Sequence, residues 1–327
     1  MKAILHIGTE KTGTTTIQGY LSKNIEKFRE NGILVPRTVG YPNNLIVPVL
    51  CYKEWRNDDL SSFAQNMFET NNYSIFREKV VKSLREEINN SGCSTVLFSS
   101  EHLQSRLISV EDVSVLKELL FDLGFQEIKI LIYLRDPAQI GQSLFSTAIK
   151  CGAVLEQQPL PNTPYFKNVC HHKNTLIRWQ SVFGKASIDV RIFDKAELYG
   201  NDLILDFLRA LEIPEYFDND VRIKDRNRSI SRHGLDVLSR LNQTYGAPSN
   251  ELIDFMETYF SQRPYRMSLK DYLIYVDFFI ESNEWVRKHY FPEKEVLFPS
   301  KTLLNEDESE NNYFDELCRL IHELTKA

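Results

Sequence analysis

The stretch His6-Ile7-Gly8-Thr9-Glu10-Lys11-Thr12-Gly13-Thr14-Thr15-Thr16 decides the fold of this chain. The apolar run 3–7 overlaps its start and stops at a glycine, as is typical of a strand buried in a parallel sheet. After it, apolar residues recur at helical spacing over 17–28, and Gly32 ends that pattern. A loop between a strand and a helix that begins at the threonines directs backbone N–H groups and the positive end of a helix dipole at one point. We therefore expect a phosphate or a sulfate to bind at this loop.

The rest of the chain alternates between strand and helix patterns up to residue 212. Further strands are expected over 94–100, 128–134 and 188–193, with helices between and after them over 73–89, 109–124, 136–152, 171–183 and 203–211. This alternation predicts an α/β fold, a mostly parallel sheet with helices on both faces. Beyond residue 230 only helical patterns remain, over 235–245, 252–260, 269–290 and 314–324.

These patterns predict how the chain is organised. We expect an α/β core over 1–228 with an insertion of loops and short helices at about 33–73. The residues 229–327 are expected to form a helical C-terminal part of the same domain or a subdomain.

Composition excludes several classes of protein. The chain has 327 residues, of which 42% are hydrophobic and 26% charged, and it contains no apolar run that could span a bilayer. We therefore expect a protein that is not an integral membrane protein and, because no secretory signal is visible, one that is cytoplasmic. A net charge of −6 argues against a general nucleic-acid binder. Five scattered cysteines favour reduced thiols over a disulfide framework or a zinc site.

The glycine spacing of residues 8–15 fits the nucleotide-binding P-loop, but Thr14 stands where that motif has lysine. The lysine comes three residues earlier, at Lys11, at the tip of the loop. From there it can reach a bridging or transferring oxygen, while the hydroxyls of Thr14 and Thr15 and the backbone N–H groups hold the adjacent phosphate. Alternatively, this stretch binds no ligand and is only a strand-to-helix turn whose threonines face solvent.

Lys11-Thr12-Gly13-Thr14-Thr15 resembles the 5′-phosphosulfate loop of the sulfotransferases, which use 3′-phosphoadenosine 5′-phosphosulfate (PAPS) as donor. The second motif of that family is a strand that ends in arginine, followed eight residues later by a serine on the next helix, and the pair binds the 3′-phosphate of the donor. Arg135 follows the 128–134 strand, and Ser143 comes at that spacing. The resemblance thus implies a donor site made of Lys11, Thr12, Gly13, Thr14, Thr15, Thr16, Arg135 and Ser143. An ion pair between Arg135 and a carboxylate at the sheet edge is the alternative.

The segment Ser99-Ser100-Glu101-His102 follows the second expected strand, where the resemblance places the residue that removes the proton of the acceptor. Some family members use histidine there and others glutamate. Adjacent side chains at a strand end point to opposite faces, so one of the two faces the transferring group. We favour Glu101, which resembles the glutamate of the polysaccharide-modifying members, and keep His102 as the alternative base. His6 is expected to be a packed core residue.

A basic cluster lies between residues 222 and 232, with five basic residues and one acid. The segment 227–231 resembles one that recurs late in bacterial sulfotransferase-like proteins, which implies that Arg228 contacts the donor. A loop of this charge would cover the donor nucleotide or hold an anionic acceptor. A solvated surface is the alternative.

The resemblance implies a PAPS-dependent sulfotransferase that moves a sulfuryl group by in-line displacement to a hydroxyl, or an amine, of a carbohydrate or glycolipid, and leaves 3′,5′-adenosine diphosphate. This scheme needs no metal ion. His171 and His172 have no acid or cysteine at metal-ligand spacing, and we expect them on a helix surface. A P-loop nucleotide kinase or NTPase that uses ATP and magnesium, with Asp136 at a strand end as its acid, is the main alternative. A catalytically inactive nucleotide-binding protein is a third possibility, against which Lys11 and Glu101 weigh.

Overall fold

A computed structural model gives the structure of the protein and describes residues 1–213, 229–261 and 263–299. The chain divides into two compact units, neither of which is continuous in sequence. The described part of the first unit is 1–135 and 172–213, and that of the second is 136–171, 229–261 and 263–299. The helix expected over 314–324 lies outside the described residues.

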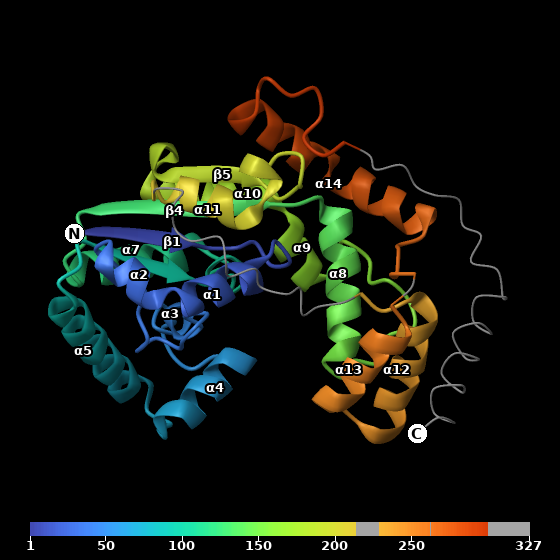
Figure 1. The fold of residues 1–327 in the computed structure, drawn as a ribbon, viewed down its shortest axis with the longest axis horizontal. Coiled ribbons are helices and arrows are strands. Elements are labelled where there is room, and N and C mark those ends of the chain that lie inside the picture. The colour runs from blue at the N-terminus through green and yellow to red at the C-terminus, as the bar shows by residue number, and fades with distance from the viewer. Residues whose placement is uncertain (214–228, 262, 300–327) are drawn as a thin grey trace. The chain divides into compact units, whose positions relative to one another are not determined.

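A parallel sheet forms the centre of the first unit (Figure 1). Its five strands lie in the order β2-β3-β1-β4-β5, and their bounds are β1 (Lys2–His6), β2 (Ile33–Leu34), β3 (Thr95–Ser99), β4 (Glu127–Leu134) and β5 (Ile188–Ile192). Every neighbouring pair is parallel, and the four strands expected from the sequence are present. The two-residue strand β2 is not among the strands expected from the sequence. It lies in the stretch 33–73, for which only loops and short helices are expected.

The helices of the first unit cover both faces of this sheet. On one face, Ile4 and Leu131 pack in a cluster with Ile17 and Phe207, which belong to α1 and α11. On the opposite face the ring of Phe98 contacts that of Phe125, which follows α7, and α7 packs against α10. The helix bounds are α1 (Thr14–Lys23), α2 (Ile25–Glu30), α3 (Ile46–Val49), α4 (Asp59–Phe68), α5 (Tyr73–Ser91), α6 (His102–Arg106), α7 (Val110–Asp122), α10 (His172–Phe183) and α11 (Leu203–Ala210), with 3-10 turns at Lys185–Ser187 and Tyr199–Asn201. The α/β prediction is confirmed.

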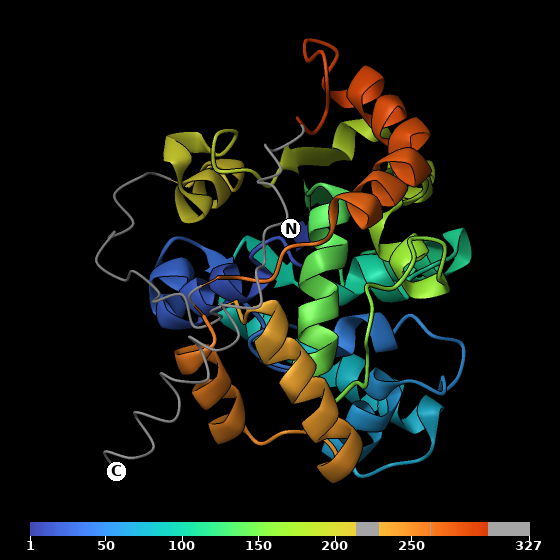
Figure 2. The same ribbon diagram turned by 90° about the vertical axis from the view of Figure 1, so that its right-hand side faces the viewer.

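The second unit is helical in its described residues. It consists of α8 (Pro137–Lys150), α9 (Pro164–Cys170), α12 (Arg232–Tyr245), α13 (Asn250–Tyr259) and α14 (Leu269–Tyr290). The helix α8 runs beside α12 in both ribbon views (Figures 1 and 2) and also packs against α9 and α14. As the sequence predicts, Asp136 caps α8 by accepting from the Ala138 N–H at 2.9 Å, and Pro137 takes the first helical position.

Candidate active site

The loop from Gly8 to Gly13 connects β1 to α1 at the carboxyl edge of the sheet. The neighbouring strand β4 holds its start, because Thr9 donates to the Tyr133 carbonyl from its N–H at 3.0 Å and from its hydroxyl at 3.1 Å. At its end Gly13 has a φ of 76° and lies so close to α11 that a Cβ would come within 2.4 Å of Leu203 Cδ2. Only glycine fits this position. Any other residue would be strained in the left-handed conformation, and its Cβ would clash with Leu203.

The first turn of α1 supplies the anion-binding groups of the loop. The helix begins at Thr14, as predicted. The Thr16 N–H donates to the Gly13 carbonyl at 3.0 Å, so the helix leaves the N–H groups of Thr14 and Thr15 for a ligand. Thr14 is buried and Thr15 is exposed at this turn. The Thr12 hydroxyl donates to the Thr9 carbonyl at 2.6 Å, so Thr12 fixes the shape of the loop. The N-terminus of a helix and this loop together form the arrangement that binds phosphate and sulfate groups in many proteins.

Lys11 lies at the tip of the loop, with a φ of 65° and a half-buried side chain. A lysine in the left-handed region is uncommon and is held there by its surroundings. One of these surroundings is Arg135, whose Nη1 donates to the Lys11 carbonyl at 2.8 Å. The arginine of the second motif therefore contacts the backbone of the first.

Two further residues position Arg135, and the sequence did not indicate either of them. The guanidinium carbon of Arg135 lies 5.5 Å from the ring centroid of Phe193, at the end of β5. His172 Nε2 donates to the Arg135 carbonyl at 2.7 Å, and His172 is fully buried. The prediction of a helix-surface position is wrong for His172, because α10 places this side chain against the end of β4.

Glu101 follows β3, the other neighbour of β1, and packs against the start of the loop. A Cβ on Gly8 would lie 3.0 Å from the Glu101 Cα, so the glycine permits this close approach. Gln18 of α1 donates from Nε2 to Glu101 Oε2 at 2.7 Å, which ties the carboxylate to the helix that starts at the loop. His102 is the first residue of α6. Gln18 was missed because only the folded chain brings α1 to the end of β3.

His6 is a core residue, as expected. It is completely buried and lies between the rings of Tyr133 and Phe207. Its Nδ1 is 2.8 Å from the hydroxyl oxygen of Ser99. Burial lowers the pKa of His6 to about 3, so the imidazole is neutral in the folded protein at neutral pH.

Ser143 and Arg228 are the remaining predicted donor contacts. Ser143 lies in α8 of the second unit, where it is half-buried, and it stays a prediction as the partner of Arg135. Arg228 lies outside the described residues. Of the basic cluster, Arg232 is described, and it pairs with Asp236 at 3.1 Å.

Three chain segments thus meet at one edge of the first unit's sheet: the loop after β1, Glu101 after β3 and Arg135 after β4. The sheet order changes direction at β1, and open α/β sheets bind ligands outside the carboxyl ends of the strands at such a point. The site combines a helix N-terminus, a lysine and an arginine with the carboxylate of Glu101. Such a set of groups can bind an anion and accept a proton.

In the described ranges no three His, Cys, Asp or Glu side chains form a group that could hold a metal ion. No helix that the structure describes combines the length and the apolar character needed to cross a membrane.

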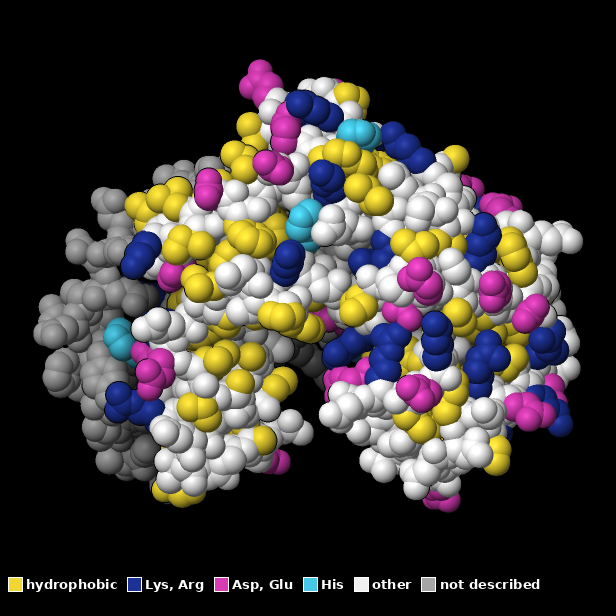
Figure 3. Space-filling model, turned by 180° about the vertical axis from the view of Figure 1, so that it is seen from behind, with side chains coloured by type: hydrophobic (Ala, Val, Ile, Leu, Met, Phe, Trp, Pro, Cys, Tyr) yellow, Lys and Arg dark blue, Asp and Glu magenta, His cyan; other side chains and the backbone are white. Residues whose placement is uncertain are grey.

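A basic groove of about 750 Å³ runs along α5 in the first unit. Figure 3 shows Lys and Arg side chains gathered over the region of α5. The groove is lined by two tyrosines, by the four bases Lys53, Arg77, Lys82 and Arg85, and by one acid, Glu78. The sequence does not indicate this groove, because Lys53 lies far along the chain from Arg77, Lys82 and Arg85 of α5.

No known family model matches the chain, and no curated protein matches it. Among solved structures, a sulfotransferase from Alicyclobacillus acidocaldarius is similar to it, with 15% sequence identity and a TM-score of 0.42. The match covers 83% of this chain and 98% of that one. A likeness this distant does not assign a function.

Proposed function

We propose that the chain is a PAPS-dependent sulfotransferase, which transfers a sulfuryl group to a hydroxyl, or an amine, of a carbohydrate or glycolipid. The observation that carries the proposal is the 2.8 Å hydrogen bond from Arg135 to the Lys11 carbonyl. It joins the two motifs that the sequence indicated independently, on neighbouring strands of the sheet. A kinase would need Asp136 as its magnesium ligand, but this carboxylate caps α8 by accepting from the Ala138 N–H at 2.9 Å. A kinase would also give Arg135 no role.

The loop and Arg135 have separate tasks in this proposal. PAPS supplies the sulfuryl group, with 3′,5′-adenosine diphosphate as the leaving product. The N–H groups of the first turn of α1 and the hydroxyls of Thr14 and Thr15 hold the 5′-phosphate, and Lys11 stabilises the negative charge that develops on the bridging oxygen. Arg135 binds the 3′-phosphate through its planar fork, with Ser143 and Arg228 as further contacts.

Glu101 is the general base of the proposed reaction. Its carboxylate is held by Gln18 at 2.7 Å, so it is fixed in one direction before the acceptor arrives. It takes the proton of the acceptor as the acceptor oxygen attacks the sulfur in line with the leaving phosphate. His102 is the alternative base. The scheme needs no metal ion.

The test is formation of 3′,5′-adenosine diphosphate from PAPS in the presence of a pool of neutral oligosaccharides. Glu101→Gln should lower the rate about 10²- to 10⁴-fold, while His102→Gln and the exposed control Glu118→Gln on α7 should keep it. The opposite pattern for Glu101 and His102 would assign the base to His102. Lys11→Ala should also be inactive, and full activity of that variant would contradict the proposal.

A further inference from the structure

The basic groove of the first unit runs along one face of α5. The residues that this helix contributes recur every three or four positions and therefore share one side of it. They are Ser74, Arg77, Glu78, Val81, Lys82 and Arg85. The interval from Arg77 to Arg85 corresponds to about 12 Å along the helix axis. The groove therefore has the length for an extended chain rather than for a single ion.

The groove is positively charged, although the whole chain has a net charge of −6. Its four bases and one acid give four minus one, or +3. Lys53, Lys82 and Arg85 are exposed and Arg77 is half-buried, so a ligand in the groove can reach these side chains. A groove lined by one sign of charge raises the local concentration of ions of the opposite sign. The groove therefore attracts anions.

Neutral partners orient the two arginines of the groove. Arg77 Nε donates to the Leu50 carbonyl at 3.1 Å, and Arg85 Nη1 donates to the Asp122 carbonyl at 2.5 Å. A carbonyl oxygen fixes the direction of a guanidinium but does not neutralise its charge. Because a guanidinium has several N–H groups, the remaining ones can donate to the carboxylate or sulfate oxygens of a ligand.

The two tyrosines of the lining offer no open ring to a ligand. Tyr52 is 2% exposed, and the guanidinium carbon of Arg56 lies 3.9 Å from its ring centroid. The ring of Tyr73 packs against those of Trp55 and Phe76, with centroids 5.3 and 6.0 Å away. Sites for single-stranded nucleic acid stack the bases on open aromatic rings. The described lining offers no such surface, so the groove favours a polyanion without bases.

Two other polar residues of the groove indicate what the ligand carries besides its charges. Ser74 and Glu78 are exposed in the lining, next to the bases of α5. Both side chains can accept hydrogen bonds from hydroxyl groups. A chain of phosphates has no hydroxyl groups along its length and would be repelled by Glu78. A chain of acidic sugar rings has both the charges and the hydroxyls.

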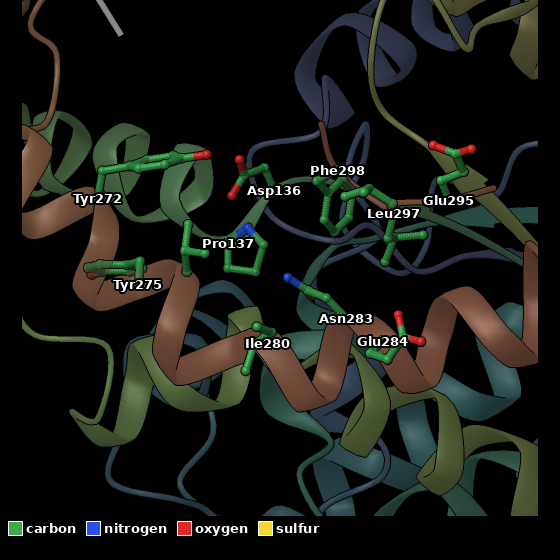
Figure 4. A pocket seen from close by; sticks show the side chains of 12 residues that line it. Asp136, Pro137, Tyr272, Tyr275, Ile280, Asn283, Glu284, Glu295, Leu297 and Phe298 are labelled. Atoms are coloured by element: carbon green, nitrogen blue, oxygen red, sulfur yellow. The ribbon is translucent and has the colours of Figure 1, made fainter. Parts of the chain in front are cut away.

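The charge of the groove distinguishes it from the cavity of about 280 Å³ beside α14 in the second unit (Figure 4). The described lining of that cavity contains Asp136, Glu284 and Glu295, and no lysine, arginine or histidine. An anion there would meet carboxylates without a compensating base. Of the two, only the groove along α5 suits an anionic ligand.

We propose that the groove along α5 binds an anionic polysaccharide, a chain of sugar rings that carry carboxylate or sulfate groups. The bases of the groove bind the acidic groups, and Ser74 and Glu78 accept hydrogen bonds from ring hydroxyls. The lining contains no residue of the candidate active site. This binding site therefore goes beyond the proposed function and does not depend on it.

The test is calorimetric titration of the full chain with hexagalacturonate and with the neutral maltohexaose. Hexagalacturonate should bind and maltohexaose should not, and added salt should weaken the binding because it screens exposed charges. Lys82→Gln and Arg85→Gln should each weaken hexagalacturonate about two- to fivefold, and the double variant about five- to twentyfold. The matched control Lys79→Gln, which changes an exposed base of α5 outside the groove, should leave the affinity unchanged.

Any of three results would overturn the proposal: no binding of hexagalacturonate at millimolar concentration, equal binding of maltohexaose, or equal effects of the groove variants and Lys79→Gln. Tighter binding of hexaglutamate would overturn it as well, and would assign the groove to an acidic protein segment. Each sample is also titrated with 3′,5′-adenosine diphosphate. Bisphosphate binding without hexagalacturonate binding would refute the polysaccharide site alone, and the reverse would refute the proposed function alone.

Discussion

Arg135 connects the two sequence motifs through the Lys11 carbonyl and, in the proposed function, also binds the 3′-phosphate of the donor. These two roles can be separated with a pair of nucleotides. Arg135→Ala should weaken 3′,5′-adenosine diphosphate at least tenfold more than 5′-AMP, because only the first has a 3′-phosphate for the guanidinium. Titration calorimetry measures both affinities. Equal losses would show that Arg135 acts only by holding the loop.

His6 gives a prediction about the dependence of stability on pH. The pKa of His6 is about 3 in the folded protein, against an ordinary value of 6.5, because the ring is buried. Between these values the unfolded chain binds one proton that the folded chain does not, so the free energy of unfolding decreases as the pH falls from 6.5 towards 3. The loss approaches about 1.4 kcal/mol per pH unit for this one residue.

Urea unfolding of the wild type and of His6→Leu at about pH 6.5 and 5 checks this. The wild type should lose about 1–2 kcal/mol more over this interval than the variant. An identical pH dependence of the two proteins would mean that folding does not lower the pKa of His6.

At the scale of elements, the start of α1 depends on Gly13, and α5 offers a matched control. Gly13 and Gly92 flank these helices with φ values of 76° and 70°. A Cβ at Gly13 would meet Leu203, whereas a Cβ at Gly92 would meet nothing within 4 Å. Gly92→Ala should therefore cost about 1–2 kcal/mol of stability from backbone strain alone and leave nucleotide binding unchanged.

Gly13→Ala should lower the stability more than Gly92→Ala does, because Leu203 must also move. It should also lower the affinity for 3′,5′-adenosine diphosphate at least tenfold. Urea unfolding and calorimetry of the two variants give both quantities. Equal effects of Gly13→Ala and Gly92→Ala on nucleotide affinity would contradict the role given to the loop.

The same elements show why some features were predictable from the sequence. The helix α7 was recognised because Ser109 and Asp112 form a capping box within four residues, and α8 because Asp136 and Pro137 signal its start locally. The loop itself was recognised from the pattern of residues 6–16.

Features that depend on distant partners were missed. The strand β2 has only two residues and exists through its pairing with β3. Gln18, which bonds Glu101, and His172, which bonds the Arg135 carbonyl, have partners 83 and 37 residues away in the chain. No periodicity or short motif encodes such contacts, because they arise only when the strands have been ordered in the sheet.

At the scale of the whole molecule, the chain passes from the first unit to the second between Arg135 and Asp136 and returns between His171 and His172. The first unit holds the loop, Glu101 and Arg135, which the proposed function assigns to the donor and to the general base. Ser143, eight residues after Arg135 in the sequence, belongs to the second unit, and its contact with the donor stays a prediction.

In the proposed function the loop binds a phosphosulfate donor and not a nucleoside triphosphate. Titration calorimetry of the full chain with 3′,5′-adenosine diphosphate, and separately with ATP plus magnesium, tests it most directly. We predict micromolar binding of the bisphosphate without magnesium, loss of that binding in Lys11→Ala, and binding of ATP at least a hundredfold weaker. Tight binding of magnesium ATP with no binding of the bisphosphate would contradict the account.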